Sequence, residues 1–142
     1  MTGESEQKEN EQKKEYLKGY EKAVRQMERS RLKIREMRLN EMCPSVMHDG
    51  MPHAQGQTDM SGYAALLDQE ERRCMKYRYQ RLKKCKEITD RIEQLSDEDE
   101  KDVLMYRYIE LMKWEDIAVK MNFSWQHTHK IHSQALKNFK MR

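Results

Sequence analysis

Apolar side chains follow a helical repeat through the first part of the chain. Between residues 11 and 42 they recur at spacings of three and four, while Lys, Arg and Glu occupy the other faces and no Pro interrupts the run. This pattern predicts one long helix with a narrow apolar stripe. The stripe consists of Tyr16, Tyr20, Ala23, Val24, Met27, Ile34 and Met37.

The next stretch breaks the repeat. Both prolines and three of the five glycines fall within residues 43–62, so this stretch cannot be a continuous helix and is expected to be a linker. A second long helix is expected from about residue 61 to 95, where Cys85, Ile88, Ile92 and Leu95 keep the same spacing. Two narrow stripes can be buried only against each other or against another copy. Residues 11–95 are therefore expected to form a coiled-coil-like helical hairpin, with a homodimer through the hairpin as an open alternative.

A third helix is expected over residues 97–112. Ser96 and Asp99 frame its start, because the hydroxyl can accept from an unpaired backbone N–H group and the carboxylate can reach back. The acidic run that follows favours the positive end of a helix. Together with the segment that comes next, this predicts an all-α chain ending in a three-helix domain over residues 96–142.

The segment from Trp114 to Phe139 has the pattern of a helix-turn-helix. A short helix with Ile117, Ala118 and Met121 on its inner face is followed by Asn122, which tolerates the left-handed conformation that ends a helix in a sharp turn. Phe123 is expected as an apolar plug, and Ser124 as the cap of a last helix over residues 124–140. Its inner face would be Thr128, Ile131, Ala135, Leu136 and Phe139. Ala118 supplies the small residue that two crossing helices need.

The outer face of the last helix has no carboxylate, since no acidic residue follows Asp116. Its amide and hydroxyl groups can bond base edges, and its Lys groups can displace counterions from phosphates. We therefore expect this helix to enter the major groove of duplex DNA. The expected DNA-binding residues are Trp125, Gln126, His127, His129, Lys130, Ser133, Gln134 and Lys137.

These residues also carry a family resemblance. Tyr106, Arg107, Tyr108, Trp114, Ile117, Ala118, Ser124, His132, Ala135 and Leu136, in this order and spacing, resemble the DNA-reading region of sigma-70-type factors. The stretch from about Leu67 to Phe139 is more similar to phage-encoded regulators of the ArpU and RinA type, whose linker also looks like this one. The resemblance implies a small regulator of phage or prophage late genes, acting at a promoter. It does not extend to a polymerase-clamping or melting region, so independent sigma activity is not implied.

Composition narrows the remaining possibilities. The chain is 37% charged with a formal net charge of +3, so a site for a polyanion must come from uneven charge distribution. Residues 1–10 have no large apolar side chain apart from the initial Met and are expected to be a disordered tail. Three widely spaced cysteines without a C-x-x-C pair, and the lack of a signal peptide or membrane span, favour a cytoplasmic protein.

Enzymatic and metal-binding roles find little support. His127, His129 and His132 point in different directions within one helix, and no cysteine pair completes a zinc site. No phosphate loop or nucleophile motif occurs, so we expect no enzyme, metal or cofactor. The main alternative is a protein-interaction adaptor that uses the hairpin to bind RNA polymerase or a phage packaging component.

Overall fold

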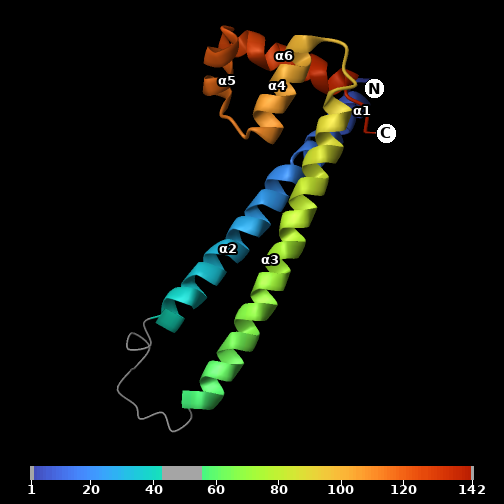
Figure 1. Cartoon of the computed structure of the whole chain (residues 1–142). Helices are drawn as coiled ribbons and strands as arrows, with labels where there is room; N and C mark the ends of the chain where they lie inside the picture. The colour runs from blue at the N-terminus through green and yellow to red at the C-terminus, as the bar shows by residue number, and fades with distance from the viewer. Residues whose placement is uncertain (1, 43–55, 142) are drawn as a thin grey trace. The chain divides into compact units, whose positions relative to one another are not determined.

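The protein is all-α. The computed structural model describes residues 2–42 and 56–141, with side chains described for residues 2–40 and 62–141. No strand occurs in these ranges, which confirms the predicted fold class. The helices follow one another as shown in Figure 1. They are α1 Thr2–Leu17, α2 Gly19–Met42, α3 Gly56–Ile92, α4 Glu98–Leu104, the π-helix η2 Met105–Ile109, α5 Trp114–Met121 and α6 Trp125–Asn138.

The chain divides into two compact units. The first, which we call the bundle unit, combines Met1–Ala23 with Arg81–Arg142. The second, which we call the hairpin unit, consists of Val24–Gln80. This division does not coincide with the predicted boundary at residue 96, because the N-terminal helix and the end of α3 join the C-terminal helices in one unit.

The N-terminus differs from the prediction. Residues 2–10 were expected in a disordered tail but belong to α1. Ion pairs along the helix support it, with the Lys13 ammonium 3.3 Å from the Glu9 carboxylate and the Lys14 ammonium 3.0 Å from that of Glu11. Contacts between α1 and α6 add tertiary support that composition does not reveal.

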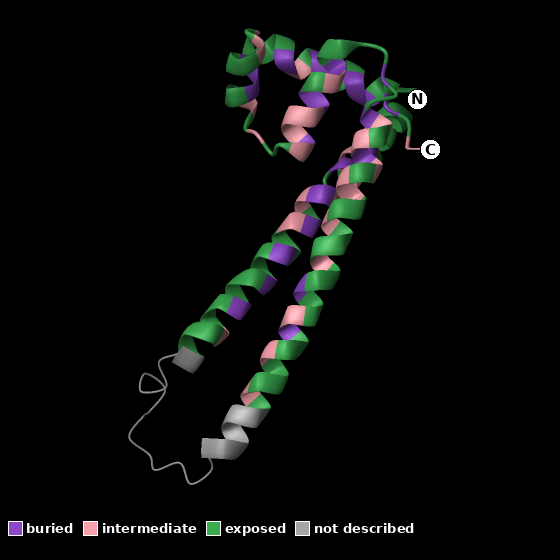
Figure 2. Cartoon of the chain, viewed as in Figure 1, coloured by how far each residue is buried: buried purple, intermediate pink, exposed green. Residues whose placement is uncertain are grey.

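The predicted long helix over residues 11–42 is almost continuous. The helical assignment is interrupted only at Lys18, next to Gly19. The backbone hydrogen bonds nevertheless continue, from Lys18 N–H to the Lys14 carbonyl at 2.9 Å and from Lys22 N–H to the Lys18 carbonyl at 3.1 Å. The predicted apolar stripe is buried at Tyr20, Ala23, Met27 and Ile34 and half-buried at Tyr16, Val24 and Met37. Figure 2 shows the buried positions recurring along α2.

The predicted linker falls mostly outside the described residues. Residues 43–55, with both prolines, are not described, whereas residues 56–62 form the first turns of α3 rather than linker. No proline follows Pro52, and glycine near a helix start costs little compared with proline in its interior.

The hairpin unit has a small apolar core. Met27, Ile34 and Cys74 are buried, with Leu67 and Tyr77 packed against them. The two helices of this unit are joined by an ion pair between Arg38 and Glu71 at 2.6 Å. Apolar positions of the two helices therefore pack against each other in this unit, whereas the predicted stripe of Cys85, Ile88, Ile92 and Leu95 lies in the bundle unit.

The region predicted as a single helix over residues 97–112 is in fact two elements. Its cap is Asp97 rather than Ser96, because the Asp97 carboxylate accepts hydrogen bonds from the backbone N–H groups of Asp99 and Glu100. After α4 the backbone widens into η2, where the Glu110 N–H donates to the Met105 carbonyl at 2.9 Å. η2 ends at Ile109, and Leu111 shortly after it adopts the left-handed conformation with φ of 58°.

The bundle unit has the larger core. Leu17, Ile88, Ile92, Val103, Leu104 and Ile117 are each 0% exposed. α6 lies at the centre of this arrangement, in contact with α1, α4 and α5. No helix in the described ranges combines the length and the apolar character needed to cross a lipid bilayer.

Candidate nucleic-acid interface

The turn between α5 and α6 is the one that the sequence predicts. Asn122 adopts the left-handed conformation with φ of 58° and ψ of 43°. Its N–H donates to the Val119 carbonyl at 3.2 Å, and the Phe123 N–H donates to the Ala118 carbonyl at 2.9 Å. This pair of bonds is the Schellman motif, which satisfies helix-terminal carbonyls while the chain turns sharply.

The start of α6 is capped as expected. The Ser124 side chain accepts a hydrogen bond from the His127 N–H at 3.1 Å. The Thr128 hydroxyl donates to the Ser124 carbonyl at 2.9 Å, which ties the first turn together from its buried side. The backbone at Trp125 and Gln126 is therefore held at the end of a well-ordered helix.

The predicted inner faces are buried, except for Met121 of α5, which is half-buried. Ile117 and Ala118 on α5 pack beneath the turn. All five predicted inner positions around α6 are also buried: Thr128, Ile131, Ala135, Leu136 and Phe139. Burial of this set commits the opposite side of α6 to the outside of the bundle unit.

Most of the predicted DNA-binding residues are exposed on that side. Trp125 is 56% exposed even though it is a large aromatic residue. Four positions, 126, 130, 133 and 137, follow one another at helical spacing and form a single stripe along α6. The exposed residues of the predicted set are Trp125, Gln126, His127, Lys130, Ser133, Gln134 and Lys137.

His129 is placed differently from the rest of the set. Its ring lies between Trp114, with ring centroids 4.4 Å apart, and Trp125, at 4.0 Å. It is half-buried, and its Nε2 atom is buried without a hydrogen-bond partner among the described residues. Position 129 of α6 faces Trp114 of α5. The His129 ring therefore packs against Trp125 instead of projecting into solvent.

Two other predicted residues have local partners. The His127 ring stands edge-on to the Phe123 ring, with centroids 4.7 Å apart. Phe123 is half-buried, so the expected apolar plug is completed by a histidine ring. The Ser133 hydroxyl donates to the His129 carbonyl at 3.1 Å, which occupies its proton and leaves its oxygen able to accept.

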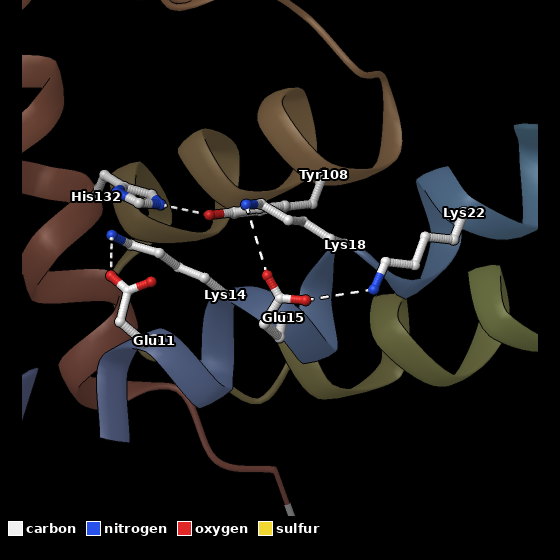
Figure 3. Close-up of polar contacts among 7 residues, drawn as sticks. All are labelled: Glu11, Lys14, Glu15, Lys18, Lys22, Tyr108 and His132. Carbon is white, nitrogen blue, oxygen red and sulfur yellow. Dashed lines mark hydrogen bonds and ion pairs between the residues drawn. The ribbon is translucent and has the colours of Figure 1, made fainter. Parts of the chain in front are cut away.

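Tyr108 and His132 form a buried polar pair that the sequence analysis did not predict. The Tyr108 hydroxyl and the His132 Nε2 atom share a hydrogen bond of 2.7 Å, drawn in Figure 3. Burial is the main cause that lowers the pKa of His132 to about 3, and neighbouring Lys14 contributes to the shift. Burial also raises the pKa of the Tyr108 hydroxyl above its ordinary range. Both groups are therefore neutral at physiological pH.

Trp114 contacts both the half-buried His129 ring and the buried His132 ring. Its ring meets the His132 ring edge-on at 4.6 Å, and the Arg107 guanidinium lies over it at 4.7 Å. Arg107 also donates a hydrogen bond to the Met112 carbonyl at 3.0 Å. Arg107, Tyr108 and Trp114 are among the residues that carry the family resemblance. The resemblance does not indicate that they contact one another or His132.

The C-terminal end of α6 is held by distant residues. The Lys13 ammonium donates to the Leu136 carbonyl at 2.9 Å and to the Lys137 carbonyl at 3.4 Å. The Asn138 amide donates to both oxygens of the buried Glu100 carboxylate at 3.1 Å. A lysine at the last carbonyls is favourable because they carry the negative end of the helix dipole.

The electrostatic character of the exposed face is cationic toward the end of α6. Lys130 and Lys137 lie on it, and no acidic residue of α6 opposes them. One carboxylate comes from elsewhere, because Glu6 of α1 forms an ion pair with Lys137 at 3.3 Å. Both side chains are largely exposed, so a phosphate can compete for this lysine.

A metal site is not assembled by the described residues. Within residues 2–40 and 62–141, no group of three His, Cys, Asp or Glu side chains is arranged to hold an ion. His127, His129 and His132 are directed toward Phe123, the two tryptophans and Tyr108, respectively.

A family model matches residues 53–140, and its description is "Protein of unknown function (DUF1492)". Because the match covers more than half of the sequence, the chain belongs to this family. A comparison with curated proteins finds no match, and a comparison with solved structures also finds none. The resemblance to ArpU, RinA and sigma-70-type factors remains a prediction.

Proposed function

We propose that this member of the DUF1492 family binds duplex DNA in a sequence-specific manner by inserting α6 into the major groove. The observation that supports the proposal is the outward side of α6. This side is exposed and contains no carboxylate. The helix α6 comes directly after the Schellman motif at Asn122, and Ser124 caps its first turn. A helix of this kind is a rigid carrier for groups that must meet base edges.

The proposed roles follow from position along the helix. Gln126 lies in the first turn and carries an amide that can bond bidentately to adenine. Lys130 and Lys137 would contact phosphates on the flanking backbone. Trp125 would pack against deoxyribose or a thymine methyl group, with His129 as the residue that positions its ring.

The biological setting is proposed from the family resemblance. A regulator of phage or prophage late genes would act in the bacterial host cytoplasm, at a promoter, and in contact with RNA polymerase. The DNA-binding part of the proposal depends on α6, whereas the regulatory part depends on the likeness to ArpU and RinA regulators.

The direct test is selection of duplexes from a random pool with the purified full chain, followed by sequencing. We expect one enriched site, and an affinity that falls with salt at a log-log slope near −0.9 for each phosphate contacted. If no sequence is enriched and binding occurs only weakly at low salt, the DNA-binding proposal is wrong and the adaptor alternative is favoured.

Two substitutions distinguish a residue that recognises a base from one that contacts a phosphate. Gln126→Ala should weaken binding to the selected site by about 1 to 3 kcal/mol and relax specificity at one base pair. Lys130→Ala should weaken binding to selected and random duplexes alike and reduce the salt slope by about 1. Both are measured by fluorescence anisotropy titrations over a series of salt concentrations.

A matched control is Lys86→Ala, which removes one exposed lysine from α3 instead of α6. It should leave both affinities nearly unchanged. Equal losses on selected and random DNA for Gln126→Ala would show that this residue does not read a base.

A further inference from the structure

The hairpin unit leaves large apolar side chains in solvent along one groove. Leu32 and Leu39 are 57% and 53% exposed and lie two helical turns apart on α2, while Met75 on α3 is 69% exposed. They border a groove of about 540 Å³. It is lined by Glu28, Arg31, Leu32, Ile34, Arg35, Arg38, Leu39, Glu71, Cys74, Met75 and Arg78.

The groove is lined by both buried and exposed apolar residues. Ile34 and Cys74, which belong to the core of the hairpin unit, are buried and contribute to its lining. Leu32, Leu39 and Met75, which also line the groove, are each more than half exposed. Methionine at such a surface adapts to the shape of an apolar partner. Exposed apolar side chains with charged residues around them are typical of a protein-interaction site.

The charge on the rim indicates what kind of partner fits. The lining contains four arginines and two glutamates, and it contains no lysine. Both glutamates already have arginine partners, Arg31 with Glu28 at 3.0 Å and Arg38 with Glu71 at 2.6 Å. Neither Arg35 nor Arg78 forms an ion pair with another described residue. Arginine is suited to planar, bidentate pairing with carboxylates.

The length of the groove fits a helix. Along α2 the lining runs from Glu28 to Leu39, which at the helical rise of 1.5 Å per residue corresponds to roughly 16 Å, or three turns. A helix laid into such a groove presents apolar residues at positions i, i+3 or i+4, and i+7. Acidic residues beside that stripe would then face the rim arginines.

We propose that this groove binds an acidic amphipathic helix of a partner protein. A second copy of the chain fits less well, because two copies related by symmetry would bring arginine-rich rims together. The inference does not depend on DNA binding, since all lining residues belong to the hairpin unit and α6 does not. It adds a partner protein with an acidic amphipathic helix to the proposed function.

The probe is a labelled helical peptide of about 16 residues, with leucines in one i, i+3/i+4, i+7 stripe and glutamates beside it. A matched peptide has lysine in place of each glutamate. We expect the acidic peptide to bind the full chain by fluorescence anisotropy and the lysine peptide to bind at least about tenfold more weakly.

Variants of the chain locate the site. Arg35→Glu and Arg78→Glu should each weaken the acidic peptide by about tenfold or more, while Arg35→Gln should have a smaller effect. Leu32→Glu should abolish binding. Arg72→Glu is the matched control, since it reverses an exposed charge on α3 outside the groove. Circular dichroism of each variant verifies that helical content is retained.

Three results would overturn the inference. Equal binding of both peptides would show that the rim charge has no role. A wild-type dimer that Leu32→Glu dissociates, measured by sedimentation equilibrium, would identify a second copy as the occupant. Acidic-peptide binding that appears only after residues 43–55 are replaced by a Gly/Ser segment of equal length would identify that segment as the occupant.

Discussion

The bundle unit and the hairpin unit use similar helices but differ in how completely they bury apolar surface. In the bundle unit α6 is contacted by α1, α4 and α5, and residues such as Leu104 and Ile117 have no exposed surface. Among the described residues of the hairpin unit only two helices meet, and Leu32 and Met75 remain exposed beside a buried core of Met27, Ile34 and Cys74. Two helices can hide only a narrow stripe, and a broader apolar surface needs a third layer.

Each unit also buries polar groups, and their partners differ. In the hairpin unit the Ser30 hydroxyl donates to the Glu70 carboxylate at 2.8 Å, and Lys33 and Arg73 approach the other oxygen from the rim. Burial acts to raise the pKa of Glu70, but the Ser30 bond and the two cations outweigh it and lower that pKa. In the bundle unit Tyr108 and His132 instead form a neutral pair away from solvent. In both units these buried polar groups are therefore satisfied by hydrogen bonds or ion pairs.

The largest expected effect comes from removing a core side chain of the bundle. Leu136 is 2% exposed, so Leu136→Ala should cost about 2 to 5 kcal/mol of unfolding free energy. Urea denaturation followed by circular dichroism reports on both units, and tryptophan fluorescence reports on the bundle unit, because Trp114 and Trp125 both lie there. The control Leu32→Ala removes a side chain that is 57% exposed and should change stability by no more than about 0.5 kcal/mol. Similar losses for the two variants would mean that the units do not differ in burial.

A smaller effect is expected at the turn before α6. Asn122→Val places a β-branched residue at φ of 58° and should cost about 1 to 3 kcal/mol in the same fluorescence measurement. Asn122→Gly is the matched variant, because glycine adopts this conformation without strain and should be close to neutral. Equal destabilisation by valine and glycine would show that the Asn122 side chain, and not its backbone conformation, is what matters.

The smallest effect is a dependence of bundle stability on pH. The pKa of His132 is lowered to about 3 in the folded chain, so the unfolded chain binds the proton more tightly. Stability is therefore fully present above the unfolded pKa near 6.5 and is lost as pH falls from there toward 3. Between pH 8 and 5.5 the loss should be about 1.4 kcal/mol.

Urea denaturation at each pH, again followed by tryptophan fluorescence, measures this loss. His132→Gln removes the titrating group and should give a flatter profile over the same interval. An unchanged slope in that variant would assign the pH dependence to another group.

Local rules explain why much of the candidate interface could be predicted. The left-handed residue Asn122, the cap Ser124 and the five predicted inner positions from Thr128 to Phe139 all depend on residues within a few positions of one another. The same rules were insufficient where several polar residues compete, since Asp97 caps α4 in place of Ser96. They also did not indicate the π-helical turn of η2, which changes the register within a run of good helix formers.

The sequence by itself determined the all-α class, the α5–α6 turn and the carboxylate-free side of α6, because helical period and backbone preference act over short distances. Only the tertiary structure decided that α1 is ordered against α6, that His129 lies between two tryptophans and that Tyr108 bonds to His132. These contacts join residues that are far apart in the chain, such as Lys13 and Leu136, which are separated by 123 positions. Such pairs depend on how several helices pack together at once, and no periodicity along a single helix encodes them.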